Sequence, residues 1–156
     1  MLQLSRKPVK ASQVEMTELV IPNDTNRMGN LLGGRLMHWM DIAAAIAASR
    51  HTNRVCVTAS VDGLHFHHPV KQGEVVILQA SVNRVFRTSL EVGVRVTKEN
   101  PLTGERQHTN TAYLTFVAID NEGRPVPAHP VKPVTSAEKR RYRDAARRRQ
   151  SRLSHR

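Results

Sequence analysis

The stretch GGRLMHWMDIAAAIAASR, residues 33–50, decides the fold of this chain. Apolar side chains such as Leu36, Met40 and Ala47 recur there at the spacing of an α-helix. Charge is almost absent from its middle, where Asp41 stands alone. A helix that is apolar around most of its circumference is a buried helix. We therefore predict a buried helix that the glycine pair opens and that ends near residue 51.

Outside this stretch the apolar residues recur with a period of two, which is typical of strands. The alternating segments are residues 14–20, 55–62, 76–82, 92–96 and 113–119. The run from Asn100 to Gly104 predicts a hairpin connection between the last two strands. One buried helix and one antiparallel sheet predict an α+β fold in which the sheet wraps around the helix.

The two ends of the chain differ from this body. Residues 1–13 predict a flexible lead-in, and four prolines between residues 125 and 133 predict an extended segment outside the sheet interior. Thr135 and Glu138 form a capping-box pattern that begins a final helix. With 156 residues the chain has room for one core. The predicted division is a lead-in over 1–13, one domain over 14–134, and a basic helix and tail over 135–156.

The formal net charge of +11 is unevenly placed. Lys139 to Arg156 holds nine basic residues and one acidic residue, whereas the rest of the chain carries only +3. A basic tail on a near-neutral body indicates a polyanionic partner such as a phosphorylated ligand, a nucleic acid or a membrane surface. The alternative, which we favour for most of the tail arginines, is a solvated helix that aids solubility.

The cellular setting is predicted to be the cytoplasm. The sequence has no apolar run of the length that crosses a membrane and no apolar segment of a secretory signal near its start. Its single cysteine, Cys56, cannot form an internal disulfide, which suits a reducing compartment.

Asp41 is the first candidate for chemistry. A carboxylate in a buried helix is costly unless it is paired or functional. Burial favours a role as a general base or a nucleophile. The alternative is a structural aspartate bonded to an arginine or to backbone N–H groups, and the sequence leaves both open.

The second candidate is the pair Gly33 and Gly34, which opens the helix. Free N–H groups at a helix N-terminus can hold an anion or a developing oxyanion. The pair could equally serve only the geometry of the turn.

The third candidate, His65-Phe66-His67-His68, suggests a metal at first sight. No cluster of acidic or cysteine ligands accompanies these histidines, so surface or interface positions are favoured. We expect no metal and no cofactor.

Together the motifs resemble a known family. Residues 22–26, the Gly29-Asn30 pair, the glycine pair and Trp39-Met40-Asp41 resemble the signature of the hot-dog acyl-CoA thioesterases. Among these they are similar above all to the bacterial acyl-CoA hydrolases related to the brain long-chain acyl-CoA hydrolase. The resemblance continues to Asp120 and covers roughly residues 16–149.

The resemblance implies an antiparallel sheet curled around one long helix, dimers that pair edge to edge, and a hexamer built as a trimer of dimers. It implies catalysis by Asp41, assisted by Asn26 of the neighbouring subunit. That the N–H groups of Gly33 and Gly34 hold the carbonyl oxygen at the positive end of the helix is our own hypothesis. The strand residues implied to lie beside the pantetheine arm are Thr58, Ala59, Ser60 and Val61. Those implied near the nucleotide end of coenzyme A are Arg87, Thr88 and Ser89.

The function implied is hydrolysis of fatty-acyl-CoA to a free fatty acid and coenzyme A, which is part of the substrate and not a cofactor. One rival is a non-catalytic acyl-CoA sensor on the same fold. Another is a nucleic-acid-binding module that uses the basic tail. An aromatic content of 4% and the lack of a recognition motif count against nucleic acid.

Overall fold

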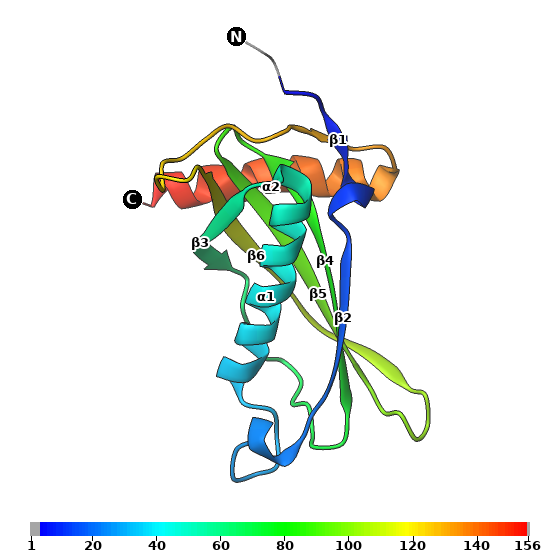
Figure 1. Ribbon diagram of the computed structural model, residues 1–156. Coiled ribbons are helices and arrows are strands. Elements are labelled where there is room, and N and C mark those ends of the chain that lie inside the picture. Colours follow the sequence, from blue (N-terminus) through cyan, green and yellow to red (C-terminus); the bar gives the residue numbers. More distant parts are fainter. Residues whose placement is uncertain (1–3, 156) are drawn as a thin grey trace.

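The computed structural model of the chain describes residues 4–155. Its centre is a five-stranded antiparallel sheet in the order β2-β4-β5-β6-β3, which curls around the helix α1 (Gly33–Thr52) (Figure 1). The strands are β2 (Val14–Leu19), β3 (Val55–Asp62), β4 (Val75–Val85), β5 (Ser89–Glu99) and β6 (Arg106–Ile119). This is the predicted hot-dog arrangement, and the α+β prediction is confirmed.

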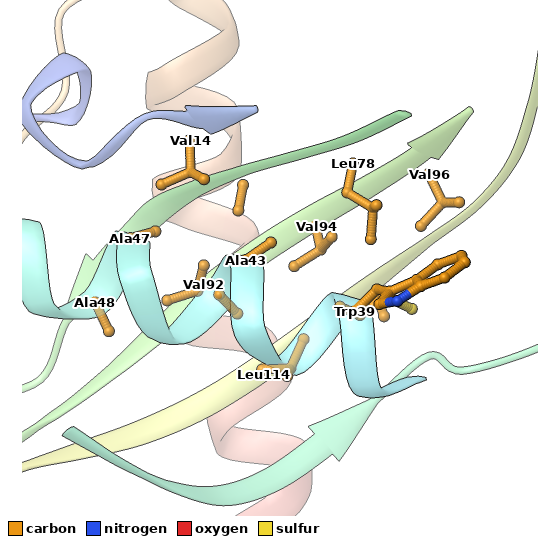
Figure 2. Packing of buried hydrophobic residues seen from close by; sticks show 14 of the residues in the cluster. Val14, Trp39, Ala43, Ala47, Ala48, Leu78, Val92, Val94, Val96 and Leu114 are labelled. Atoms are coloured by element: carbon orange, nitrogen blue, oxygen red, sulfur yellow. The ribbon is translucent and has the colours of Figure 1, made fainter. Parts of the chain in front are cut away.

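The core lies between α1 and the concave face of the sheet. The helix contributes small side chains, Ala43, Ala44, Ala47 and Ala48, all of them fully buried. Figure 2 shows the labelled alanines of α1 facing valines of β5. Because alanine carries only a Cβ atom, the helix backbone approaches the strands closely, and the larger valine and leucine side chains of the sheet fill the interface.

The side of α1 that faces away from the sheet is partly exposed, which corrects the prediction of a buried helix. Met37, Ile42 and Ile46 are 38%, 37% and 37% exposed. Val55 and Val57 of the edge strand β3 are exposed as well. The helix is apolar on both sides, as the sequence indicated, but one subunit covers only one of them.

A β-bulge in β3 determines which side chains face the helix. The pairing of β3 with β6 shifts between Thr58 and Ser60, leaving Ala59 without a partner. Successive strand residues point to opposite faces, so one extra residue reverses the alternation. Thr58 before the bulge and Val61 after it therefore both point towards α1, and Asp62 points to the outer face.

The helix α2 (Ser136–Ser154) crosses the outer face of the sheet, opposite α1 (Figure 1). Its predicted capping box is present, because the Glu138 N–H donates to Thr135 Oγ1 at 3.1 Å. The Arg148 guanidinium makes two hydrogen bonds, of 2.8 and 2.9 Å, to the buried carboxylate of Glu91 on β5. Near the end of α2, Arg152 binds Asp62 at 2.7 Å.

The interpretation of α2 as a merely solvated helix is therefore wrong for Arg148 and Arg152. It agrees with the exposure of Arg140, Arg141 and Arg143.

The start of the chain also differs from the prediction. Within the expected lead-in, β1 (Lys7–Pro8) pairs in parallel with β7 (Val131–Lys132), and a 3-10 helix follows over Val9–Ser12. Ser12 is fully buried, and its hydroxyl accepts the Val82 N–H at 2.9 Å. The Ser12 hydroxyl satisfies a backbone N–H of β4 that has no partner in a neighbouring strand. This contact packs the start of the chain into the folded unit. Residues 1–3 lie outside the described residues.

The connections are as predicted. Gly104 closes the β5–β6 hairpin at a positive φ of 79°, and its N–H donates to the Asn100 carbonyl. The proline-rich segment contributes only the two-residue strand β7. The division at residues 14–134 and 135–156 stays a prediction. Within residues 4–155, no helix combines the length and apolar character needed to cross a membrane.

We expect Arg148→Ala to destabilise the protein, because Glu91 is 1% exposed and would lose its counter-charge. Asn83 still donates to that carboxylate at 2.9 Å. The free energy of unfolding should therefore fall by about 2–3 kcal/mol. Denaturant unfolding would measure this loss of stability. The control is Arg143→Ala, which replaces an exposed arginine of the same helix and should cost about 0.5 kcal/mol or less. Equal effects of the two variants would show that the Arg148–Glu91 pair does not hold α2 on the sheet.

Candidate functional site

A cavity of about 300 Å³ lies between α1 and the strands β3 and β6. Its wall is mostly apolar, and the apolar side chains are Met37, Met40, Val61, Leu64 and Leu114. Three polar side chains, His38, Asp41 and Thr58, share this space. A small number of polar groups in an apolar cavity is the usual composition of a small-molecule site.

Asp41 is held in the cavity by a single hydrogen bond. The Thr58 hydroxyl donates to Asp41 Oδ1 at 2.7 Å. Within residues 4–155, Asp41 has neither an arginine partner nor a backbone N–H donor, which are the partners of the structural alternative. Its second oxygen, Oδ2, is available to a water molecule or a substrate.

The glycine pair begins α1 next to this cavity. The N–H groups of Arg35 and Leu36 donate to the Leu32 carbonyl, at 3.1 Å each. Among the described residues no acceptor is bonded to the N–H groups of Gly33 and Gly34, which are free as the first N–H groups of a helix usually are. The two glycines nevertheless differ in their surroundings.

A Cβ atom on Gly33 would lie 3.2 Å from the Phe66 ring. The absence of a side chain at Gly33 therefore leaves room for Phe66, which belongs to the loop after β3. No atom lies within 4 Å of a Cβ on Gly34, which lines the cavity itself.

Asn26 lies apart from Asp41 in the same chain. It is an exposed residue of the loop before α1, and its Oδ1 accepts the N–H groups of Met28 at 2.9 Å and Asn30 at 3.2 Å. These bonds orient the side chain and leave its Nδ2 group without a partner among the described residues. The cavity wall does not include Asn26.

The other predicted residues divide into two groups. Thr58 and Val61 line the cavity, whereas Ala59 occupies the bulge and Ser60 does not reach the wall. The segment from Arg87 to Ser89 forms the β4–β5 turn, where the Arg87 carbonyl accepts the Ala128 N–H at 2.7 Å. Arg87 has a positive φ of 110°. The structure does not bring this turn to the cavity within one chain.

The histidine-rich segment is exposed, as predicted. The rings of His65 and His67 lie 5.7 Å apart. Across residues 4–155 no three His, Cys, Asp or Glu side chains are grouped as metal ligands would be.

Sequence reasoning missed some of the cavity residues. His38 stands three residues before Asp41, so it lies on the same helix face, and this spacing was an available signal. Leu64 follows Gly63, whose positive φ of 73° turns the chain back over the cavity. No local pattern indicates that Leu114 on β6 would reach the same space.

The thioesterase superfamily profile matches residues 28–105 of this sequence. The uncharacterized acyl-CoA thioester hydrolase YkhA of Bacillus subtilis (strain 168) is 46% identical over 129 residues, covering 83% of this chain and 75% of YkhA. The chain belongs to the thioesterase superfamily.

Solved structures of other members superpose on nearly the whole chain. An apo-hexameric acyl-CoA thioesterase has a TM-score of 0.94 and 40% identity, with 97% of each chain covered. The acyl-CoA hydrolase of Staphylococcus aureus, in complex with butyryl coenzyme A, coenzyme A and coenzyme A disulfide, has a TM-score of 0.90 and 33% identity. That match covers 96% of this chain and 92% of the S. aureus chain. The superfamily membership and the fold of this chain rest on these sequence and structure matches.

We expect Thr58→Val to lower kcat/KM while leaving the fold intact, because valine keeps the shape of threonine but cannot donate to Asp41. Loss of a hydrogen bond to a charged group is worth about 1.5–3 kcal/mol. This corresponds to a fall of roughly 10- to 100-fold. Thr58→Ser keeps the hydroxyl and serves as the control. If steady-state kinetics place the valine and serine variants at the same rate, the bond to Asp41 has no role in turnover.

Proposed function

We propose that the protein hydrolyses fatty-acyl-CoA thioesters in the cavity between α1 and β3. The observation that carries this proposal is the Asp41 carboxylate, held at 2.7 Å by Thr58 inside an apolar cavity and otherwise free. The superfamily membership and the acyl-CoA hydrolases that resemble the whole chain support it. The protein is accordingly a thioester hydrolase.

The reaction needs an attacking oxygen and a stabilised carbonyl oxygen. The N–H groups of Gly33 and Gly34 are placed at the positive end of α1, where they can bind the oxygen that becomes negatively charged. Asp41 then either removes a proton from the attacking water or attacks the carbonyl carbon itself to give an anhydride that water cleaves. In both cases the C–S bond breaks, the thiol of coenzyme A takes a proton, and the acid is released.

The apolar wall suits an acyl chain. Met40, Leu64 and Leu114 offer carbon and sulfur surface, and transfer of a chain from water to such a wall is favourable by about 0.8 kcal/mol per methylene. Methionine adapts its shape to flexible chains. The strand from Thr58 to Val61 then lies beside the pantetheine arm.

Structures of three variants of the S. aureus hydrolase support these assignments. They carry an alanine in place of an aspartate, an asparagine and a threonine, respectively, and the asparagine variant is a complex with coenzyme A. The asparagine precedes the aspartate by 15 residues and the threonine follows it by 17. Asn26, Asp41 and Thr58 have the same two separations.

The site is completed by a second subunit in this proposal. The exposed apolar face of α1 and the edge strand β3, with Val55 at 66% exposure, provide a surface for a dimer. Asn26 lies outside the Asp41 cavity of its own chain and has a free amide group, which fits a role in the partner's cavity. The turn from Arg87 to Ser89 would bind the nucleotide end of coenzyme A across a subunit boundary.

The hexamer is taken as a trimer of such dimers, in line with the hexameric relative. A cytoplasmic location stays part of the proposal.

Asp41→Asn should lower kcat by more than about 100-fold, because the amide can neither accept a proton nor attack. The shape of the side chain is nearly unchanged, so the melting temperature and the oligomer should match the wild type. Release of free thiol from acyl-CoA measures the rate. A rate within about tenfold of the wild type, a barrier change of only ~1.4 kcal/mol, would remove Asp41 from the chemical step.

Mixing Asn26→Ala subunits with Asp41→Asn subunits should restore part of the activity that each variant lacks alone. A mixed dimer contains one site with both native side chains if the two residues come from different subunits. Subunits are exchanged under mild denaturation, and differently tagged heterodimers are purified before the assay. Inactive purified heterodimers would contradict a site shared between subunits, without bearing on Asp41 itself.

A further inference from the structure

His38 is the third polar side chain of the cavity between α1 and β3, and the reaction proposed above gives it no part. It stands four residues after Gly34 and three residues before Asp41, so the three residues share one face of α1. Along the helix axis, the Cα atom of His38 lies about 6 Å beyond that of Gly34 and about 4.5 Å before that of Asp41. A thioester bound between the Gly34 N–H group and the Asp41 carboxylate therefore lies beside the imidazole.

The side chains of the cavity wall offer few hydrogens to a substrate. Thr58 has a single hydroxyl hydrogen, which it donates to Asp41 Oδ1 at 2.7 Å. The apolar side chains of the wall carry no N–H or O–H group. His38 is exposed to the cavity and makes no hydrogen bond or ion pair to any of residues 4–155. Of the side chains in this wall, the imidazole is thus the one whose N–H is not already engaged.

Hydrolysis needs a hydrogen at this place when the C–S bond breaks. An alkyl thiolate is basic near neutral pH, so a proton delivered to sulfur during bond cleavage lowers the barrier. If Asp41 attacks the carbonyl carbon, it is held in the anhydride and cannot carry that proton. An imidazole changes its charge between about pH 5 and 8, which suits it to the transfer.

We propose that His38 is a catalytic residue that gives its proton, as an imidazolium, to the sulfur of the leaving coenzyme A. The inference rests on the proposed function and adds the acid to it. The electron pair of the C–S bond goes to sulfur, which takes the proton, and His38 becomes neutral.

The second half of the cycle restores the charge of His38. In the anhydride route, the neutral imidazole removes a proton from the water that cleaves the anhydride. In the general-base route, the imidazole takes back the proton that Asp41 has removed from the attacking water. Either way, one water is consumed per thioester and both side chains return to their starting charges.

Few other charges act on His38 in this cavity. On its own helix these are Asp41 and Arg35, and Arg35 is paired with Asp24 at 3.2 Å. The cavity residues that β3, the loop after it and β6 contribute are all uncharged. The titration of the acid is therefore coupled above all to Asp41.

The basicity of the leaving group provides the decisive test, with the full-length protein and two thioesters of one fatty acid. Coenzyme A is an alkyl thiol that needs a proton, whereas the aryl thiol thionitrobenzoate leaves as a stable anion. For His38→Gln we expect kcat/KM to fall at least about 100-fold with acyl-CoA and less than about tenfold with the aryl thioester. The control His68→Gln replaces an exposed histidine outside the cavity wall, and both rates should stay within about threefold of the wild type.

The pH profile gives a second measurement, which needs only a folded wild type. The acid must be protonated, so kcat/KM for acyl-CoA should fall as the pH rises through the titration of the imidazolium. The fall at low pH belongs to Asp41, which must be ionised. We expect the alkaline fall to be absent with the aryl thioester, and absent with both substrates in His38→Gln.

Equal losses on the two thioesters would show that His38 only positions Asp41 or the substrate, and would overturn its role as the acid. So would an unchanged rate with acyl-CoA, or an alkaline fall that persists in His38→Gln. Such results leave hydrolysis by the wild type intact. A wild type that releases no thiol from acyl-CoA would instead overturn the proposed function itself.

Discussion

The close packing of the alanine face of α1 into the curl of the sheet is the contact on which the rest of the structure depends. Ala43, Ala44, Ala47 and Ala48 are fully buried against the strands. Larger side chains at these positions would push the helix away from the sheet. A displaced helix would also lose the 2.7 Å bond between Asp41 and Thr58, since the two residues belong to the two packed elements. The same constraint that stabilises the fold therefore positions the carboxylate.

Much of the fold could be predicted from the sequence because the two periods are clear in it. The helical spacing over residues 33–50 and the alternation in the strands each reflect one packed face, which is a local signal. Asp41 was identified for the same reason, as a charge within an apolar helix. Thr58 and Val61 entered only through the resemblance, because the bulge at Ala59 that turns both inwards leaves no mark on the alternation.

The features that the sequence did not reveal depend on contacts between distant segments. Glu91 reads as an ordinary outward residue of β5 until α2 brings Arg148 to it. The buried position of Ser12 depends on the partner that β4 lacks at Val82. The predictions of a flexible lead-in and of a solvated helix were wrong at Ser12 and Arg148. At both positions a polar side chain satisfies a polar group that is distant in the sequence.

At the end of β3, neighbouring residues face opposite sides of the sheet and make different contacts. Val61 lines the Asp41 cavity, and Asp62, on the other face, holds Arg152 of α2 at 2.7 Å. Leu64, two residues later, lines the Asp41 cavity again. The Arg152–Asp62 ion pair thus anchors, from the outer face of the sheet, the segment that forms part of the wall of the Asp41 cavity. The basic helix therefore supports the wall of the Asp41 cavity, even though it shares no residue with that cavity and lies on the other face of the sheet.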